Sequence, residues 1–290
     1  MRNKKTKFFA KLLLSGFAIY LVYIKLDHER FLLVLKSLDL WYLVPAVVFF
    51  VLSKICTALR LNAIFRTIEV FISEKENFRL YAVGMFYNLF LPGGVGGDGY
   101  KVVVINKFLK TPVKNLVQAV LLDRLLGLAA IVVFLLIFSW WIELSLPIIF
   151  AFPKDLYLIF SIIVIPAFYL FQWILFRDFI ASFLIGMILS FLGQTSQLIC
   201  TYMILLALGI TEGIANYQFV FLISSVATVI PITVGGIGIR ELVFIYSEKF
   251  VEISVNSAVA FSLVFFMITA LVSLSGALVK TSFTSSFKNS

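Results

Sequence analysis

The sequence has 290 residues, a formal net charge of +9, 62% hydrophobic residues and 13% charged residues. Ordinary globular domains carry roughly 25% charged residues. A soluble fold of this size is excluded, because it could not hide so much apolar surface from water, and we expect an all-α integral membrane protein of the multi-pass type.

The residues needed for common catalytic sites are scarce. Cys56 and Cys200 both lie in apolar stretches, and His28 is the only histidine. We therefore expect no disulfide framework and no metal site. The sequence contains no phosphate-binding loop, zinc-protease motif or nucleophile elbow, so no catalytic residue and no cofactor are predicted and the chain is not expected to be an enzyme. The basic residues are scattered between apolar stretches, which favours an anionic membrane surface as partner and not nucleic acid.

Six apolar stretches approach or exceed the length of about 20 residues that a membrane-spanning helix needs. They cover residues 8–25, 40–60, 115–142, 156–176, 181–208 and 257–279. The first follows a basic start that resembles a signal peptide, but it lacks a small-residue cleavage pattern and is expected to be retained. Two shorter apolar stretches, 79–92 and 216–231, each end at a proline and run into a glycine cluster. This length is typical of re-entrant hairpins.

The distribution of lysine and arginine predicts the orientation. We assume that the chain starts in the cytoplasm and that each short stretch leaves the membrane on the side from which it entered. Of the 24 Lys and Arg residues, 16 then lie on the cytoplasmic side and 6 on the opposite side, while Lys54 and Arg124 fall within spans. This bias obeys the positive-inside rule. We therefore expect a protein of the cell (inner or cytoplasmic) membrane with both termini in the cytoplasm. Lys54 is expected to extend its amine towards the membrane surface.

One motif occurs twice in the sequence, once at the end of each short apolar stretch. Residues 91–101 align without gaps on residues 230–240, with the shared pattern Pro-x-x-Val-Gly-Gly-x-Gly-x-[Lys/Arg]. Three spans separate the copies, so the second copy must enter from the opposite face of the bilayer. The single membrane domain 1–290 is thus predicted to be an inverted-topology repeat, with halves 1–142 and 156–280, as in many alternating-access transporters.

The glycines allow a sharp turn, and the helix that follows each turn begins with free N–H groups. A cation, Lys101 or Arg240, lies just beyond each turn. Free N–H donors beside a cation are typical of a phosphate-binding site. The alternative is that the glycines only permit close helix packing.

Further charged residues lie in or near the predicted spans. Asp123 and Arg124 are adjacent in the third span, where each needs its own partner because neighbouring side chains diverge on a helix. The hairpin cations are candidates for Asp123; the alternative is that both residues are interfacial anchors. Arg60, at the end of the second span, is either an anchor or a functional residue.

The two motifs differ in their acidic residues. Asp98 occurs only in the first motif and Glu241 only in the second. Either the two hairpins interact differently with a ligand, or one of the two carboxylates pairs with the cation next to it. The polar patch 194–197 in the fifth span either lines a cavity or joins helices.

The runs 88–101, 122–127 and 231–241 together resemble the lysylphosphatidylglycerol synthase transmembrane (flippase-like) family. In two-part members of that family, a cytosolic domain makes an aminoacyl lipid and the membrane part moves it to the outer leaflet. Because the sequence ends at Ser290, we expect the membrane part only, without the synthase domain. The motifs, together with Arg60, mark the expected substrate-binding residues: Asn88, Gly96, Gly97, Asp98, Lys101, Asp123, Arg124, Gly235, Gly236, Arg240, Glu241 and Arg60.

The function expected from the repeat and the resemblance is that of a lipid flippase or lipid transporter, which moves a polar-headed (phospho)lipid between leaflets. Its partner would be an anionic or polyprenyl-linked lipid, with the headgroup and the oligomeric state left open. The alternative is an integral-membrane enzyme or accessory subunit acting on lipid-linked glycans, with Asp98 as its base. A membrane scaffold without transport activity is the third possibility.

Overall fold

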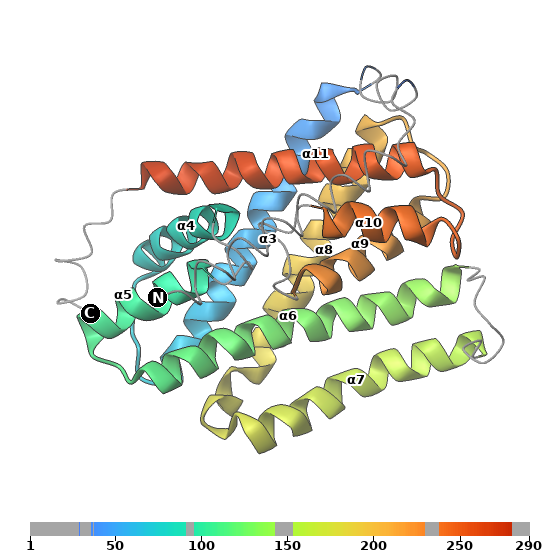
Figure 1. Ribbon diagram of the computed structural model, residues 1–290. Coiled ribbons are helices and arrows are strands. Elements are labelled where there is room, and N and C mark those ends of the chain that lie inside the picture. The colour runs from blue at the N-terminus through green and yellow to red at the C-terminus, as the bar shows by residue number, and fades with distance from the viewer. Residues whose placement is uncertain are drawn as a thin grey trace, which may run out of the picture.

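The computed structural model describes residues 29, 36, 38–90, 96–142, 153–229 and 238–279. Within these ranges the chain forms helices and no strand, which confirms the all-α prediction (Figure 1). The elements are α3 (Leu40–Arg66), α4 (Glu74–Phe90), α5 (Gly96–Leu109), α6 (Val113–Trp141), α7 (Lys154–Leu175), η2 (Arg177–Ser182), α8 (Phe183–Ala207), α9 (Ile214–Val229), α10 (Ile239–Ser247), α11 (Val255–Leu274) and η3 (Ser275–Leu278).

Five of the helical stretches in these ranges are long and apolar enough to cross a membrane. They are α3, α6, α7, η2 with α8, and α11 with η3. They match five of the six predicted spans to within a few residues; α3 continues six residues beyond the predicted end at residue 60. The remaining predicted span, 8–25, lies outside the described residues.

The outer surface of the helices carries large apolar side chains. On α7, for example, Ile162 is 70% exposed and Ile174 is 61% exposed. Water would oppose such exposure along a whole helix, whereas lipid accommodates it. This surface supports a multi-pass membrane protein.

The centre of the molecule is an antiparallel pair, α3 and α8 (Figure 1). The start of α3 meets the end of α8, where the Asp39 N–H donates to the Ala207 carbonyl over 2.8 Å. In the middle of the pair a Cβ added to Gly193 would lie 3.4 Å from the Cβ of Cys56. The two helices thus lie close together at a small residue, as is common between membrane helices.

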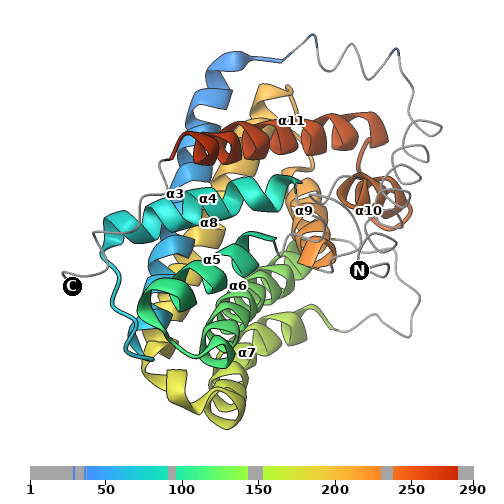
Figure 2. The ribbon, with the colours of Figure 1, turned by 60° about the vertical axis from the view of Figure 1, so that its left-hand side comes forward.

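Each central helix is followed by two short helices and then by a long one. α4 and α5 pack together between α3 and α6, and α9 and α10 pack together between α8 and α11. The two short pairs lie on different sides of the central helices, and α6 and α11 run in opposite directions (Figures 1 and 2). The predicted turns between the short helices, residues 91–95 and 230–237, lie outside the described residues and include Gly235 and Gly236.

The buried apolar side chains form two clusters that follow the same division. One contains mainly residues of α3, α5 and α6, such as Phe65, Ile105 and Leu122. The other contains mainly residues of α8, α9 and α11, such as Ile204 and Phe261. The two short pairs also contact the other half: α4 packs against α11 and η3, where a Cβ at Gly276 would lie 2.1 Å from the Ala82 carbonyl oxygen, and α9 packs against α6.

Candidate functional site

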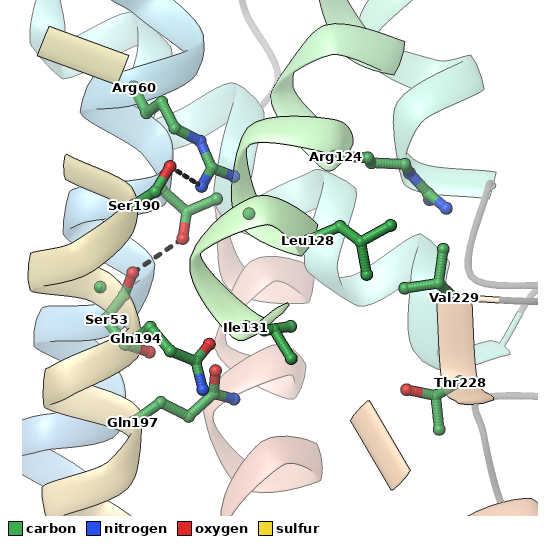
Figure 3. A pocket seen from close by; sticks show the side chains of 13 residues that line it. Ser53, Arg60, Arg124, Leu128, Ile131, Ser190, Gln194, Gln197, Thr228 and Val229 are labelled. Carbon is green, nitrogen blue, oxygen red and sulfur yellow. Dashed lines mark hydrogen bonds between the residues drawn. The ribbon is translucent and has the colours of Figure 1, made fainter. Parts of the chain in front are cut away.

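A partly open polar cavity of about 300 Å³ lies between the central helices, α6 and the end of α9 (Figure 3). Each long helix contributes one face, with residues three or four positions apart, because such positions lie on one side of a helix. The lining residues are Ser53, Thr57 and Arg60 from α3, Arg124, Gly127, Leu128 and Ile131 from α6, Ser190, Gly193, Gln194 and Gln197 from α8, and Thr228 and Val229 from α9.

Arg60 joins the three long helices at this cavity. Its Nε donates to Asp123 Oδ1 over 2.7 Å, and its Nη1 donates to Ser190 Oγ over 2.9 Å. A Cβ added to Gly127 would lie 3.2 Å from Nη1, so this glycine leaves room for the guanidinium group. Both charged side chains are almost completely buried. The anchor interpretation of Arg60 and Asp123 does not fit this geometry, because both groups lie between helices.

Asp98, on α5, connects the helix pair α4–α5 (the first hairpin) to the same cavity. Its Oδ1 lies 3.2 Å from Lys101 Nζ, and its Oδ2 accepts a 2.6 Å hydrogen bond from Arg124 Nε. Asp123 and Arg124 thus have separate partners, as predicted. The expectation that a hairpin cation pairs with Asp123 is wrong, because Arg60 holds that carboxylate.

Lys101 is enclosed within the first hairpin. It is 4% exposed, and its ammonium lies 4.2 Å from the centre of the Tyr81 ring in addition to its contact with Asp98. Its charge is balanced inside the protein. A phosphate group could reach Lys101 only by displacing these partners.

Gly97, near the start of α5, already has a hydrogen-bond partner and a close packing neighbour. The Gly97 N–H donates to Asn88 Oδ1 over 2.7 Å, and a Cβ at Gly97 would lie only 2.0 Å from the Gly84 carbonyl oxygen. The close-packing alternative therefore applies at Gly97. Gly96 is the first residue of α5.

Glu241 caps α10, the second helix of the pair α9–α10 (the second hairpin). Its Oε2 accepts a 2.7 Å hydrogen bond from the Gly238 N–H, where the backbone has a φ of +87° that favours glycine, and its Oε1 accepts from Ser262 Oγ over 2.8 Å. No ion pair with Arg240 forms among the described residues. Of the two motif acids, only Asp98 pairs with its neighbouring cation.

Arg240 belongs to a different region from the cavity. Its guanidinium carbon lies 4.5 Å from the centre of the Phe265 ring and 5.2 Å from that of Phe221. The structure thus brings together four of the predicted residues: Arg60, Asp98, Asp123 and Arg124. Arg240 instead contacts the rings of Phe221 and Phe265.

The polar patch 194–197 divides between two environments. Gln194 and Gln197 line the cavity, whereas Ser196 bonds to the Leu192 carbonyl of its own helix over 2.8 Å and Thr195 is exposed. Gln194 is 7% exposed, and its amide nitrogen has no hydrogen-bond partner within the described ranges. An unsatisfied buried donor is costly, so this amide marks a position for an acceptor from a bound molecule or water.

Sequence reasoning missed the small polar residues of the cavity. Ser53, Thr57 and Arg60 on α3 have the same spacing as Ser190, Gln194 and Gln197 on α8. This spacing was the available signal, since it puts each set on one helix face. The cavity combines cations, hydroxyls and amides, which suits a polar anionic group. No metal-binding group of three His, Cys, Asp or Glu side chains occurs in the described segments.

Comparison with known proteins agrees with the resemblance seen in the motifs. The family model described as the lysylphosphatidylglycerol synthase TM region matches residues 8–276, a range that contains both hairpins and every residue of the cavity. A comparison with curated proteins gave no match. The extent of the family match shows that the chain belongs to the family of the lysylphosphatidylglycerol synthase TM region.

Proposed function

We propose that this protein moves a polar-headed phospholipid between membrane leaflets, with the headgroup passing through the cavity and the acyl chains remaining in lipid. The observation that carries the proposal is the placement of Arg60, Arg124 and the unsatisfied Gln194 amide in one cavity between apolar helices. Ionisable groups among spanning helices are costly, and they normally mark a pathway for a polar substrate.

The dimensions of the cavity support a headgroup and not a whole lipid. Its volume of about 300 Å³ is at the lower end of the range for small-molecule sites, roughly 300–1,000 Å³. Long acyl chains would not fit. They would extend along the exposed apolar faces of the helices.

Arg124 is the cation best placed to meet a phosphate first. Its side chain is 29% exposed, compared with 7% for Arg60. A phosphate that replaced Asp98 on Arg124 would weaken the link between the first hairpin and α6. Headgroup binding would thereby be coupled to movement of the hairpin, which is the coupling that an alternating-access mechanism needs.

The arrangement of the helices supports an inverted-topology repeat. α3 with α4–α6 and α8 with α9–α11 have the same order of long and short helices, and the corresponding long helices run in opposite directions (Figures 1 and 2). Two halves related in this way would let the hairpins approach the cavity from opposite faces of the bilayer.

The glycan-enzyme alternative has no comparable support. Its proposed base, Asp98, has one carboxylate oxygen on Lys101 and the other on Arg124. Each oxygen is therefore held by a cation, and no carboxylate is among the described residues that line the cavity.

A scrambling assay tests the proposal. Proteoliposomes would carry phosphatidylglycerol labelled with NBD on one acyl chain, and dithionite added outside would bleach the label that reaches the outer leaflet. We expect faster bleaching than in protein-free vesicles and a loss of about tenfold in rate for Arg124→Gln, because a hydrogen bond to a charged group contributes about 1.5–3 kcal/mol. Arg177→Gln, at an exposed arginine of η2, is the matched control. Equal bleaching with and without protein would contradict the proposal.

A further inference from the structure

Two cations outside the cavity share one aromatic cluster. Lys54 Nζ lies 4.7 Å from the centre of the Phe50 ring, and the Arg240 guanidinium carbon lies 4.5 Å from the centre of the Phe265 ring. The two rings touch edge to face, with centroids 5.8 Å apart, and Phe221 packs against Phe265 at 4.9 Å. Helices α3, α9, α10 and α11 therefore bring two positive charges onto adjoining ring faces.

Neither cation has a carboxylate within 4.0 Å among the residues that the structure describes, whereas Arg60 and Lys101 each have one. Glu241 is the acid next to Arg240 in sequence, but both of its oxygens are engaged by Gly238 and Ser262. Lys54 and Arg240 interact electrostatically with each other. Arg240 is also attracted by the Glu241 carboxylate, so the cluster holds two positive charges near one negative charge.

One positive charge of the cluster is therefore not balanced by a carboxylate among the described residues. Repulsion between like charges is strong away from bulk water, and the attraction of a cation to a ring face offsets only part of it. A phosphate group would neutralise both cations, because Lys supplies a compact charge and Arg supplies two parallel N–H donors that match phosphate oxygens. Both residues are half-buried.

We infer that Lys54 and Arg240, held on the faces of Phe50 and Phe265, form a second anion site that takes a phosphate-bearing group. Neither residue lines the polar cavity, so this site is additional to Arg60 and Arg124. Its assignment to a lipid phosphate rests on the proposed function, in which it would be a position for the headgroup on the side of the α9–α10 hairpin. The anion site itself does not rest on that function.

Protection of Arg240 from chemical modification tests the inference. The purified full chain in neutral detergent would be treated with the arginine reagent 2,3-butanedione, and modification of Arg240 and of exposed Arg177 would be compared by peptide mass spectrometry. We expect dioleoylphosphatidylglycerol to slow modification of Arg240 about tenfold relative to dioleoylglycerol, which lacks the phosphate, and to leave Arg177 unaffected. Protection by inorganic phosphate as well would identify a general phosphate site; protection by the phospholipid alone would identify a lipid site.

Variants show whether the two cations act together. Lys54→Gln should abolish the protection of Arg240, and Lys54→Arg should retain it because the charge remains. Lys249→Gln is the matched control: Lys249 also lies over a ring, that of Tyr246 at 5.9 Å, but it is exposed. Equal modification of Arg240 in phosphatidylglycerol and dioleoylglycerol, or no reaction of Arg240 in any condition, would overturn the inference. Protection without scrambling would instead retain the site and reject the proposed function.

Discussion

Arg60 and Asp123 face each other between α3 and α6 with almost no contact with solvent. Their 2.7 Å contact has the same length as that between Arg66 and Glu74, yet the exposed fractions of the two pairs differ greatly: 7% and 10% for the side chains of the first, 54% and 41% for those of the second. Removing one member of a buried pair leaves an uncompensated charge, whereas an exposed charge is rehydrated. Burial, and not distance, decides the energetic effect.

Asp123→Asn should lower the free energy of unfolding by about 3–5 kcal/mol, because the buried Arg60 guanidinium loses its counter-charge. Replacing both members, as in Arg60→Met with Asp123→Leu, should recover part of this loss. Arg66→Gln should cost less than about 1 kcal/mol. Unfolding by SDS in mixed micelles measures all three. Similar losses for Asp123→Asn and Arg66→Gln would contradict the argument.

At the scale of the elements, the first hairpin depends on one close approach between α4 and α5. A Cβ at Gly97 would meet the Gly84 carbonyl oxygen at 2.0 Å, whereas a Cβ at Gly99, two residues further along the same helix, would meet nothing within 4 Å. The glycines of one motif therefore have different roles.

Gly97→Ala should push α4 and α5 apart and destabilise the protein by about 1–3 kcal/mol, the usual cost of overpacking. It should also slow scrambling, because Asp98 and Lys101 follow directly on the displaced helix. Gly99→Ala, the matched control, should be neutral or stabilise by up to about 1 kcal/mol through helix propensity. SDS unfolding and the dithionite assay provide the two measurements. Equal effects of the two substitutions would show that the Gly84 contact does not hold the hairpin.

Helix positions were more predictable from the sequence than side-chain partners. The bounds of α6 and α9 lie within a few residues of the predicted stretches, because apolar length and a following proline are local signals. The partner of Asp123 was not predictable, since it depends on which face of α3 meets α6. Lys54 shows the same limit: Phe50 lies four residues before it on α3, so their contact is local, but the proximity of Arg240 on α10 depends on how the helices pack.

At the scale of the whole molecule, the directions of the helices agree with the proposal of two halves of opposite orientation. α3 and α8 are antiparallel at the centre, and α6 and α11 run in opposite directions beside them (Figure 1). If these helices cross the bilayer, both ends of the α4–α5 pair lie at one membrane face and both ends of the α9–α10 pair lie at the other. The bias of lysine and arginine predicts that the first of these faces is cytoplasmic.

Cysteine accessibility tests this arrangement at four exposed positions in a background without the native cysteines. In intact cells, a membrane-impermeant maleimide should label Glu212→Cys and Lys249→Cys, which flank the second hairpin. Lys75→Cys and Lys114→Cys, which flank the first, should react only after permeabilisation, because the bilayer separates them from the reagent. The reverse pattern would keep the inverted arrangement and reverse the predicted orientation. Labelling of Lys114→Cys and Lys249→Cys from the same side would place both hairpins at one face, and an alternating-access pathway between opposed hairpins would then be wrong.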